Sequence, residues 1–148
     1  MQRQQGSYSV EFVLTFLILF STIFLAIEVG RFTLTSSIVD LRFRELVYES
    51  RTLHSPPLSK LKEKYFSQQQ FIDGEDVSLT SKACETMVHY LANMCSFGKG
   101  VPQHIVEYSL VYEYQPIIPL LQGSGKGLWQ HESVMVVRNE PDFEVSKW

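Results

Sequence analysis

The feature that most constrains this chain is an uninterrupted apolar run near its N-terminus. Between Phe12 and Ile27 the sequence FVLTFLILFSTIFLAI contains no charged residue, no glycine and no proline. A helix from Val10 to Val29 would be about 30 Å long at about 1.5 Å per residue, which matches the hydrocarbon thickness of a bilayer. We therefore expect one membrane-spanning helix, with a single further domain in the rest of the 148-residue chain.

Glu11 places a carboxylate just inside this apolar segment, where a charge costs free energy unless it has a partner. In a chain that begins at Ser7, the free α-amine lies four residues before Glu11, which is one helical turn away. An ammonium group there would neutralise the carboxylate on the same chain or on a neighbouring one. The alternative is that Glu11 marks the interfacial end of an ordinary membrane anchor, and the spacing alone leaves both interpretations open.

The sequence around Glu11 resembles the processing site of type IV pilins and pseudopilins. A short polar leader, MQRQQG, ends at Gly6, and a glutamate follows at the fifth position after it. The stretch GSYSVEFVLTFLILFSTIFLAIEVGRF is similar to the TadE/TadF pseudopilins of the tight-adherence (Flp, type IVb) pilus. A VEF triplet, here ending at Phe12, and a closing E-x-G-R are common in that family. The closing residues correspond here to Glu28, Gly30 and Arg31.

The C-terminal part carries a second resemblance to the same family. The sequence VVRNEP, at positions 136–141, is similar to the C-terminal segment of TadF-type members. The residues of this segment that fit the family are Arg138, Asn139 and Glu140. The apolar helix also lacks the early proline that is frequent in TadE-type members, which favours the TadF type.

The resemblance implies a minor pseudopilin, a structural and assembly component that supports adhesion and biofilm formation. It implies cleavage by a prepilin peptidase between Gly6 and Ser7, and other pilins or pseudopilins as partners. The expected segments are a leader (1–6), a transmembrane helix (7–30) in the lipid of the bacterial inner membrane, and an exported, periplasmic α+β domain (31–148). The resemblance also leaves open that the subunit is incorporated into a surface pilus.

The basic residues near the apolar run indicate the opposite orientation. Arg3 lies on the N-terminal side, whereas Arg31, Arg42 and Arg44 follow on the other side. A count of basic residues weakly favours a cytoplasmic domain. We give precedence to the resemblance, because its leader must face a cytoplasmic peptidase.

A second helical segment follows the apolar run. Between positions 36 and 49 one apolar stripe has helical spacing, and on another face Asp40 and Arg44 are spaced as a favourable i,i+4 pair. The stripe consists of Val39, Phe43, Leu46 and Val47. It fits packing on the domain, or a contact between filament subunits. Pro56 and Pro57 end this helix, and a short amphipathic helix follows from Leu58 to Phe66.

The second half of the chain shows the periodicity of strands. From 104 to 114 apolar and polar residues alternate, as is typical of a half-buried strand. A second strand is expected at 128–138 and a short third one at 76–80. The segment 83–94 is ambiguous between helix and strand, and we favour a helix, with a loop at 96–102. The predicted fold class is α+β: a long N-terminal helix that continues from the membrane and packs on a small antiparallel sheet.

Cys84 and Cys95 are the only cysteines. In an exported domain such a pair indicates a disulfide. Eleven residues of one continuous helix span about 16 Å, whereas a disulfide needs Cα atoms roughly 4.4–6.8 Å apart. A disulfide therefore requires a break between the two cysteines, which Asn93 is placed to supply. Free thiols and a metal site are the alternatives.

No pattern in the sequence indicates catalysis. The GSGKG stretch at 123–127 lacks the first glycine and the Ser or Thr of a phosphate-binding loop, and the histidines show no H-E-x-x-H spacing. A net charge of −3 gives no reason to expect nucleic-acid binding. We expect no metal, no cofactor and no enzymatic activity. The alternative function is that of an uncleaved single-pass envelope protein whose periplasmic domain binds a partner or ligand.

Overall fold

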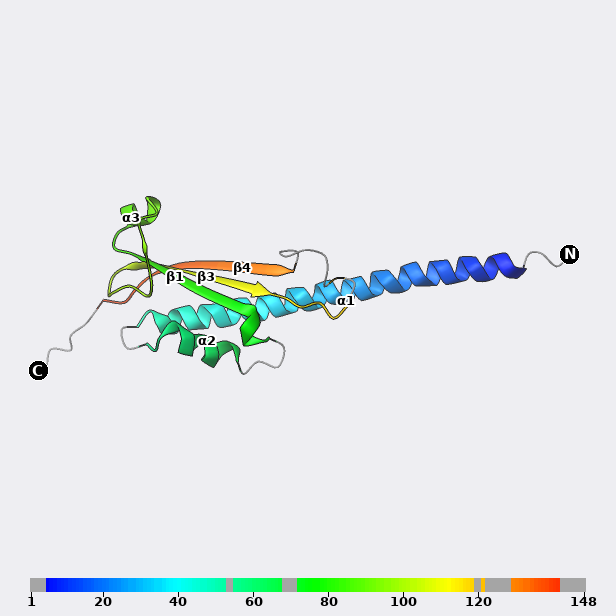
Figure 1. The fold of residues 1–148 in the computed structure, drawn as a ribbon, viewed down its shortest axis with the longest axis horizontal. Coiled ribbons are helices and arrows are strands. Elements are labelled where there is room, and N and C mark those ends of the chain that lie inside the picture. Colours follow the sequence, from blue (N-terminus) through cyan, green and yellow to red (C-terminus); the bar gives the residue numbers. More distant parts are fainter. Residues whose placement is uncertain (1–4, 53–54, 68–71, 119–120, 122–128, 142–148) are drawn as a thin grey trace, which may run out of the picture.

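One long helix dominates the computed structural model of the chain, and a short helix and a sheet pack on its C-terminal half (Figure 1). The structure describes residues 5–52, 55–67, 72–118, 121 and 129–141. Helix α1 (Gln5–Ser50) has 46 residues. It runs from the apolar segment into the amphipathic one without a break, as the sequence predicted.

The hydroxyl groups of Thr15, Ser21 and Thr22, within the apolar half of α1, bond backbone carbonyls of the same helix. Thr15 Oγ1 donates a hydrogen bond to the carbonyl of Glu11 (2.8 Å), and Ser21 Oγ donates one to the carbonyl of Leu17 (2.7 Å). Bonds of this kind let a hydroxyl lie in an apolar medium without an outside partner. These hydroxyls therefore do not interrupt the apolar surface.

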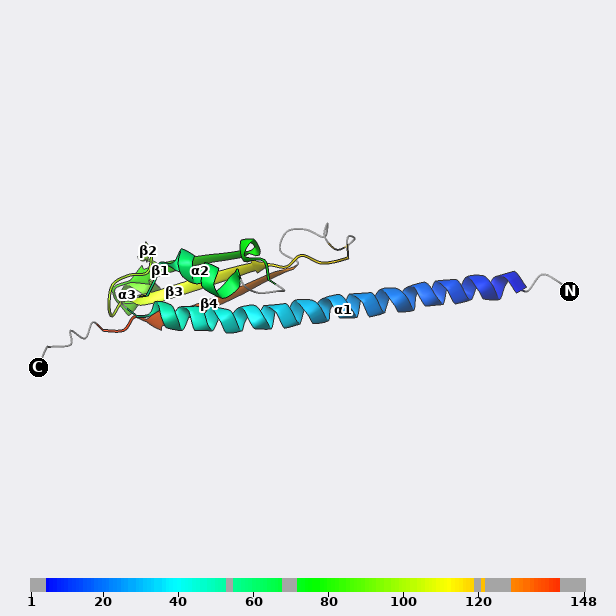
Figure 2. The same cartoon turned by 90° about the horizontal axis from the view of Figure 1, so that it is seen from below.

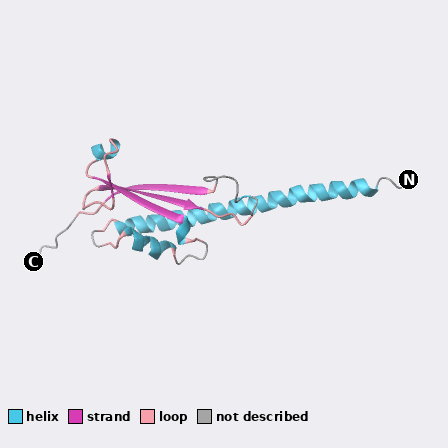
Figure 3. Ribbon diagram, viewed as in Figure 1, coloured by secondary structure: helices cyan, strands magenta, loops and turns pink. Residues whose placement is uncertain are grey.

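The remaining elements form a small α+β layer (Figure 3). After α1 the chain forms α2 (Leu58–Phe66), η1 (Gly74–Asp76), β1 (Val77–Cys84), α3 (Met87–Leu91), β2 (Ser96–Phe97), β3 (Ile105–Glu113) and β4 (Gln130–Arg138). The four strands form one sheet in the order β2-β1-β3-β4, in which every neighbouring pair is antiparallel. The predicted α+β class with a small antiparallel sheet is confirmed.

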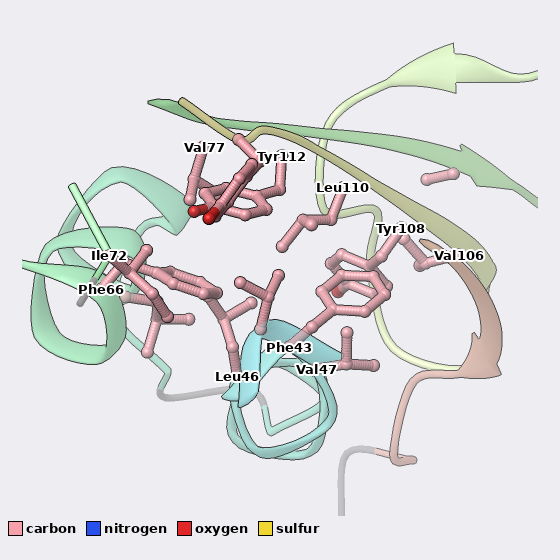
Figure 4. Packing of buried hydrophobic residues seen from close by; sticks show 14 residues of the cluster. Phe43, Leu46, Val47, Phe66, Ile72, Val77, Val106, Tyr108, Leu110 and Tyr112 are labelled. Carbon is pink, nitrogen blue, oxygen red and sulfur yellow. The ribbon is translucent and has the colours of Figure 1, made fainter. Parts of the chain in front are cut away.

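The sheet covers one side of the C-terminal half of α1, while the N-terminal half extends well beyond it (Figure 2). The core lies between α1, α2 and β3 (Figure 4). Phe43 lies at the centre of this core, where its side chain is 1% exposed. It packs with the other residues of the predicted stripe against the sheet. Core residues include Val39, Leu46 and Val47 from α1, Leu61 and Phe66 from α2, and Val106, Tyr108, Leu110 and Tyr112 from β3. The stripe of α1 therefore serves the core of its own domain.

The two predicted long strands are present as β3 and β4, and the alternation predicted for β3 is confirmed. In β3 the even-numbered side chains from Val106 to Tyr112 are buried, and Tyr114 just after the strand is buried too. In β4 the odd-numbered side chains are half-buried and the even-numbered ones exposed. Both strands thus turn one face toward α1, which explains why period-two patterning located them.

The predictions for the segment between β1 and β3 are partly wrong. Ala83 and Cys84 extend β1, because they pair with Val106 and Ile105 of β3, and the helix is confined to Met87–Leu91. Part of the expected loop at 96–102 is strand β2, which pairs with β1. Pairing with distant strands decides these residues, and local sequence does not contain that information.

Asp40 also differs from the prediction. Its Oδ1 lies 2.9 Å from Nε2 of His131 on β4, so among the described contacts Asp40 joins α1 to the sheet rather than pairing with Arg44.

Candidate functional site

The N-terminal half of α1 presents an apolar surface that nothing in the described part of the chain covers. From Val10 to Ile27 its large apolar side chains are all well exposed. Within residues 9–50, α1 is long and apolar enough to cross a membrane. A surface of this size is not stable in water, so it requires lipid or other helices around it.

A row of aromatic rings runs along this surface. Four phenylalanines follow one another at intervals of four, with ring centroids 6.2, 5.0 and 5.1 Å apart. They are Phe12, Phe16, Phe20 and Phe24. Sequence reasoning recognised Phe12 as part of the VEF triplet but missed the row, although its spacing of four is visible in the sequence.

Glu11 lies on the exposed surface of α1. Its carboxylate has no hydrogen-bond or ion-pair partner within the part of the chain that the structure describes, and only its backbone carbonyl accepts a bond, from Thr15. The backbone of Gly6 and Ser7 already belongs to α1. Cleavage after Gly6 and pairing of the new α-amine with Glu11 both stay predictions.

Glu28 behaves differently, because it is 3% exposed although it lies at the end of the apolar run. Its Oε1 accepts hydrogen bonds from the hydroxyl of Tyr114 (2.9 Å) and from the backbone N–H of Ile117 (2.8 Å). Its Oε2 lies 3.6 Å from Nη1 of Arg31. We call these four residues the helix–sheet clamp, because they fasten the end of β3 to the middle of α1.

Ring contacts and burial reinforce the clamp. The rings of Phe32, Tyr114 and Trp129 lie 5.4 to 6.0 Å apart, and the Arg31 guanidinium lies 6.0 Å from the centre of the Tyr114 ring. Burial and, second to it, the hydrogen bond to Glu28 raise the pKa of the Tyr114 hydroxyl. Tyr114 therefore remains a neutral donor to Glu28 at physiological pH.

Gly30, the third residue of the closing motif, makes no comparable contact. A Cβ added at Gly30 would meet no described atom within 4 Å. Packing within the described part of the domain therefore does not require a glycine there.

The C-terminal motif forms a second clamp at the other end of the domain. The Asn139 side-chain amide donates to the carbonyls of Lys99 (2.9 Å) and Val101 (3.2 Å). Arg138 Nε donates to the carbonyl of Gln103 (3.0 Å). These bonds fasten the chain after β4 to the loop before β3.

The same motif also reaches the C-terminal end of α1. The backbone N–H of Glu140 donates to the carbonyl of Arg51 (3.2 Å), and Arg51 Nε donates to the carbonyl of Arg138 (3.2 Å). Both motifs thus lie where the sheet is fastened to α1, one at each end of the contact.

Cys84 and Cys95 form a disulfide with Cα atoms 4.6 Å apart. The chain between them reverses at Asn93, which has a positive φ of 55°. The disulfide closes the α3 loop onto the end of β1, at the end of the domain farthest from the apolar half of α1 (Figure 1).

The described residues offer no metal site, since they contain no group of three or more His, Cys, Asp or Glu side chains that could hold an ion. The GSGKG stretch lies outside the described residues. Comparison of the chain with family models, with curated proteins and with solved structures finds no match.

Proposed function

We propose that this chain is a minor pseudopilin, a structural and assembly subunit of a tight-adherence (type IVb) pilus that supports adhesion and biofilm formation. The observation that carries the proposal is the continuous helix α1. Its N-terminal half is apolar and bare, and its C-terminal half is the packing partner of a small sheet. A helix of this kind can lie in a bilayer as a stored subunit and later pack against the helices of other subunits in a filament.

The proposed mechanism has no catalytic residue in this chain. A prepilin peptidase cuts between Gly6 and Ser7, and the new α-amine pairs with Glu11 on the same or a neighbouring subunit. Glu11 is favourable for this role because its carboxylate lies on the exposed surface of α1 and has no partner among the described residues. The domain is periplasmic, and its two clamps keep it fastened to α1.

The first experiment is the intact mass and N-terminal sequence of the protein recovered from native membranes. A chain that begins at Ser7 supports processing. A chain that still begins at Met1, in cells with an active prepilin peptidase, refutes it and leaves an uncleaved single-pass envelope protein.

Glu11→Ala tests the assembly step. We expect the variant to be retained in the membrane but to be lost from assembled pili, because an unpaired ammonium group remains in an apolar environment. Thr15→Ala is the matched control, since Thr15 lies one turn further on the same exposed surface and bonds only the Glu11 carbonyl. Normal piliation by Glu11→Ala would refute the pairing.

The second candidate function is binding of a partner protein by the domain, and an exposed apolar surface of the domain favours it. Around the disulfide-closed loop several large apolar side chains are exposed, at the end of the domain away from the membrane helix. They are Met87, Val88, Leu91, Met94, Phe97 and Val101. Clusters of this kind mark protein interaction sites. Replacement of Leu91 and Phe97 by serine should abolish pull-down of a partner while the disulfide still forms, and unchanged pull-down would refute it.

A further inference from the structure

A groove opens beside α1 at the helix–sheet clamp and extends from there toward the N-terminal half of the helix. It has a volume of about 770 Å³. α1 lines it from Ser21 to Arg31, and the chain after β3 lines it with Ile117, Ile118 and Leu121. We call it the junction groove. In Figure 2 the coloured residues directly after β3 continue past the end of the sheet, toward the apolar half of α1.

The position of the junction groove along α1 places it at membrane depth. If the bilayer covers α1 from Val10 to Val29, Ser21 lies eight residues inside the outer boundary, which is about 12 Å at about 1.5 Å per residue. If the bilayer ended at Ser21, the side chains of Phe24 (49% exposed) and Ile27, which lie further along α1 toward the sheet, would be in water. The apolar surface of α1 therefore requires lipid at the level of the groove.

Ile117, the first of the groove residues after β3, is suited to the same depth. Ile117 is 66% exposed, and its backbone N–H is already bonded to Glu28. The hydroxyl of Ser21 is bonded within α1. These two polar groups need no water, which is the condition for lying in hydrocarbon.

The polarity of the junction groove matches a phospholipid. Its wall along α1 is mainly apolar. Its end nearest the sheet carries the Glu28 carboxylate, which is already bonded within the clamp, and the guanidinium of Arg31, which pairs with Glu28 and whose side chain is still 41% exposed. An acyl chain fits the apolar part, and a phosphate lies within reach of an arginine at the headgroup level. A volume of this size is in the range of sites that take a ligand-sized molecule.

We infer that Ile117, Ile118 and Leu121 are inserted into the leaflet on the side of the sheet, and that phospholipid acyl chains fill the junction groove. The domain then has two membrane contacts, α1 and these residues, and is held against the bilayer instead of pivoting on α1. The inference rests on the membrane placement of α1, which the proposed function shares, but not on cleavage or on pili.

The test places one added tryptophan at each of three exposed apolar positions of the full chain: F24W on α1 in the membrane, I117W in the groove, and L41W on α1 beside the sheet. Each variant is reconstituted as a single chain in nanodiscs of phosphatidylcholine with or without bromine on the acyl chains. The unsubstituted protein supplies the background of the two native tryptophans. The sites are exposed, so the fold should tolerate the substitutions, which circular dichroism checks.

We expect bromine to quench I117W about as much as F24W and to leave L41W unquenched. If bromine quenches F24W but leaves I117W as unquenched as L41W, the inference is overturned. α1 is then the single membrane contact, a result compatible with the proposed function. Absence of quenching in both would overturn the inference and also remove the membrane placement on which the proposed function depends. Equal quenching of all three would refute the depth argument.

Discussion

Removal of the Tyr114 hydroxyl measures the strength of the helix–sheet clamp. Tyr114→Phe deletes the bond to Glu28 but keeps the ring that packs against Phe32 and Trp129. A hydrogen bond to a charged group contributes about 1.5–3 kcal/mol. Glu28 keeps its bond from Ile117, so we expect a loss of about 2 kcal/mol, near the lower end of that range.

The assay is urea unfolding of the full chain in detergent, followed by tryptophan fluorescence, to which Trp129 contributes beside Tyr114. With a slope of about 1–3 kcal/mol per molar urea, the midpoint should fall by about 1 M. Tyr48→Phe is the control, because Tyr48 is an exposed tyrosine of α1 that makes no side-chain hydrogen bond among the described contacts. We expect the control to stay within about 0.5 kcal/mol of the unsubstituted protein.

A double-mutant cycle with Glu28→Gln tests whether the two residues act through one bond. Glu28→Gln turns two charge-assisted hydrogen bonds into neutral ones and removes the ion pair with Arg31, which together should cost about 2 kcal/mol. If Tyr114 and Glu28 act together, the double variant should lose about 1 kcal/mol less than the sum of the single losses. Additive losses, or a Tyr114→Phe effect no larger than that of Tyr48→Phe, would refute the clamp.

Three further perturbations test the core, the disulfide and a buried tyrosine. Phe43→Ala should destabilise the domain by about 3–5 kcal/mol, whereas Leu41→Ala, at a 58% exposed position, should change stability little; equal effects in urea unfolding would contradict the assigned core. Reduction of the disulfide between Cys84 and Cys95 should cost at most about 3 kcal/mol and leave the β3–β4 hairpin folded, with hydrogen exchange as the measurement; loss of protection in β3 would contradict this. Burial, with Asp76 a smaller cause, raises the pKa of Tyr112 to about 12. The resulting stability of about 3 kcal/mol is present below pH 10 and is lost as the pH rises toward 12, and Tyr112→Phe should flatten that loss in alkaline unfolding curves.

The elements that the sequence predicted well are those in which one local pattern also sets burial. α1 follows from an apolar run without glycine or proline, and β3 follows from strict alternation. Such patterns need no knowledge of distant residues, because helix and strand periodicity place apolar side chains on one face. The predictions at 83–84 and 96–97 were wrong because both depend on pairing within the sheet: residues 83–84 pair with β3, which begins at Ile105, and residues 96–97 pair with β1.

The candidate site divides in the same way. The sequence alone indicated a membrane-spanning helix, marked Glu11 as a charge in need of a partner, and singled out both family-like motifs. It did not reveal that Glu28 is buried, since its partner Tyr114 is 86 residues away. Nor did it show that Asn139 holds the loop before β3, or that Asp40 bonds His131.

Composition and periodicity thus determined which surfaces of this protein avoid water. Only the tertiary structure decided which polar groups meet, because a buried carboxylate is stable only where folding brings donors to it from distant parts of the chain.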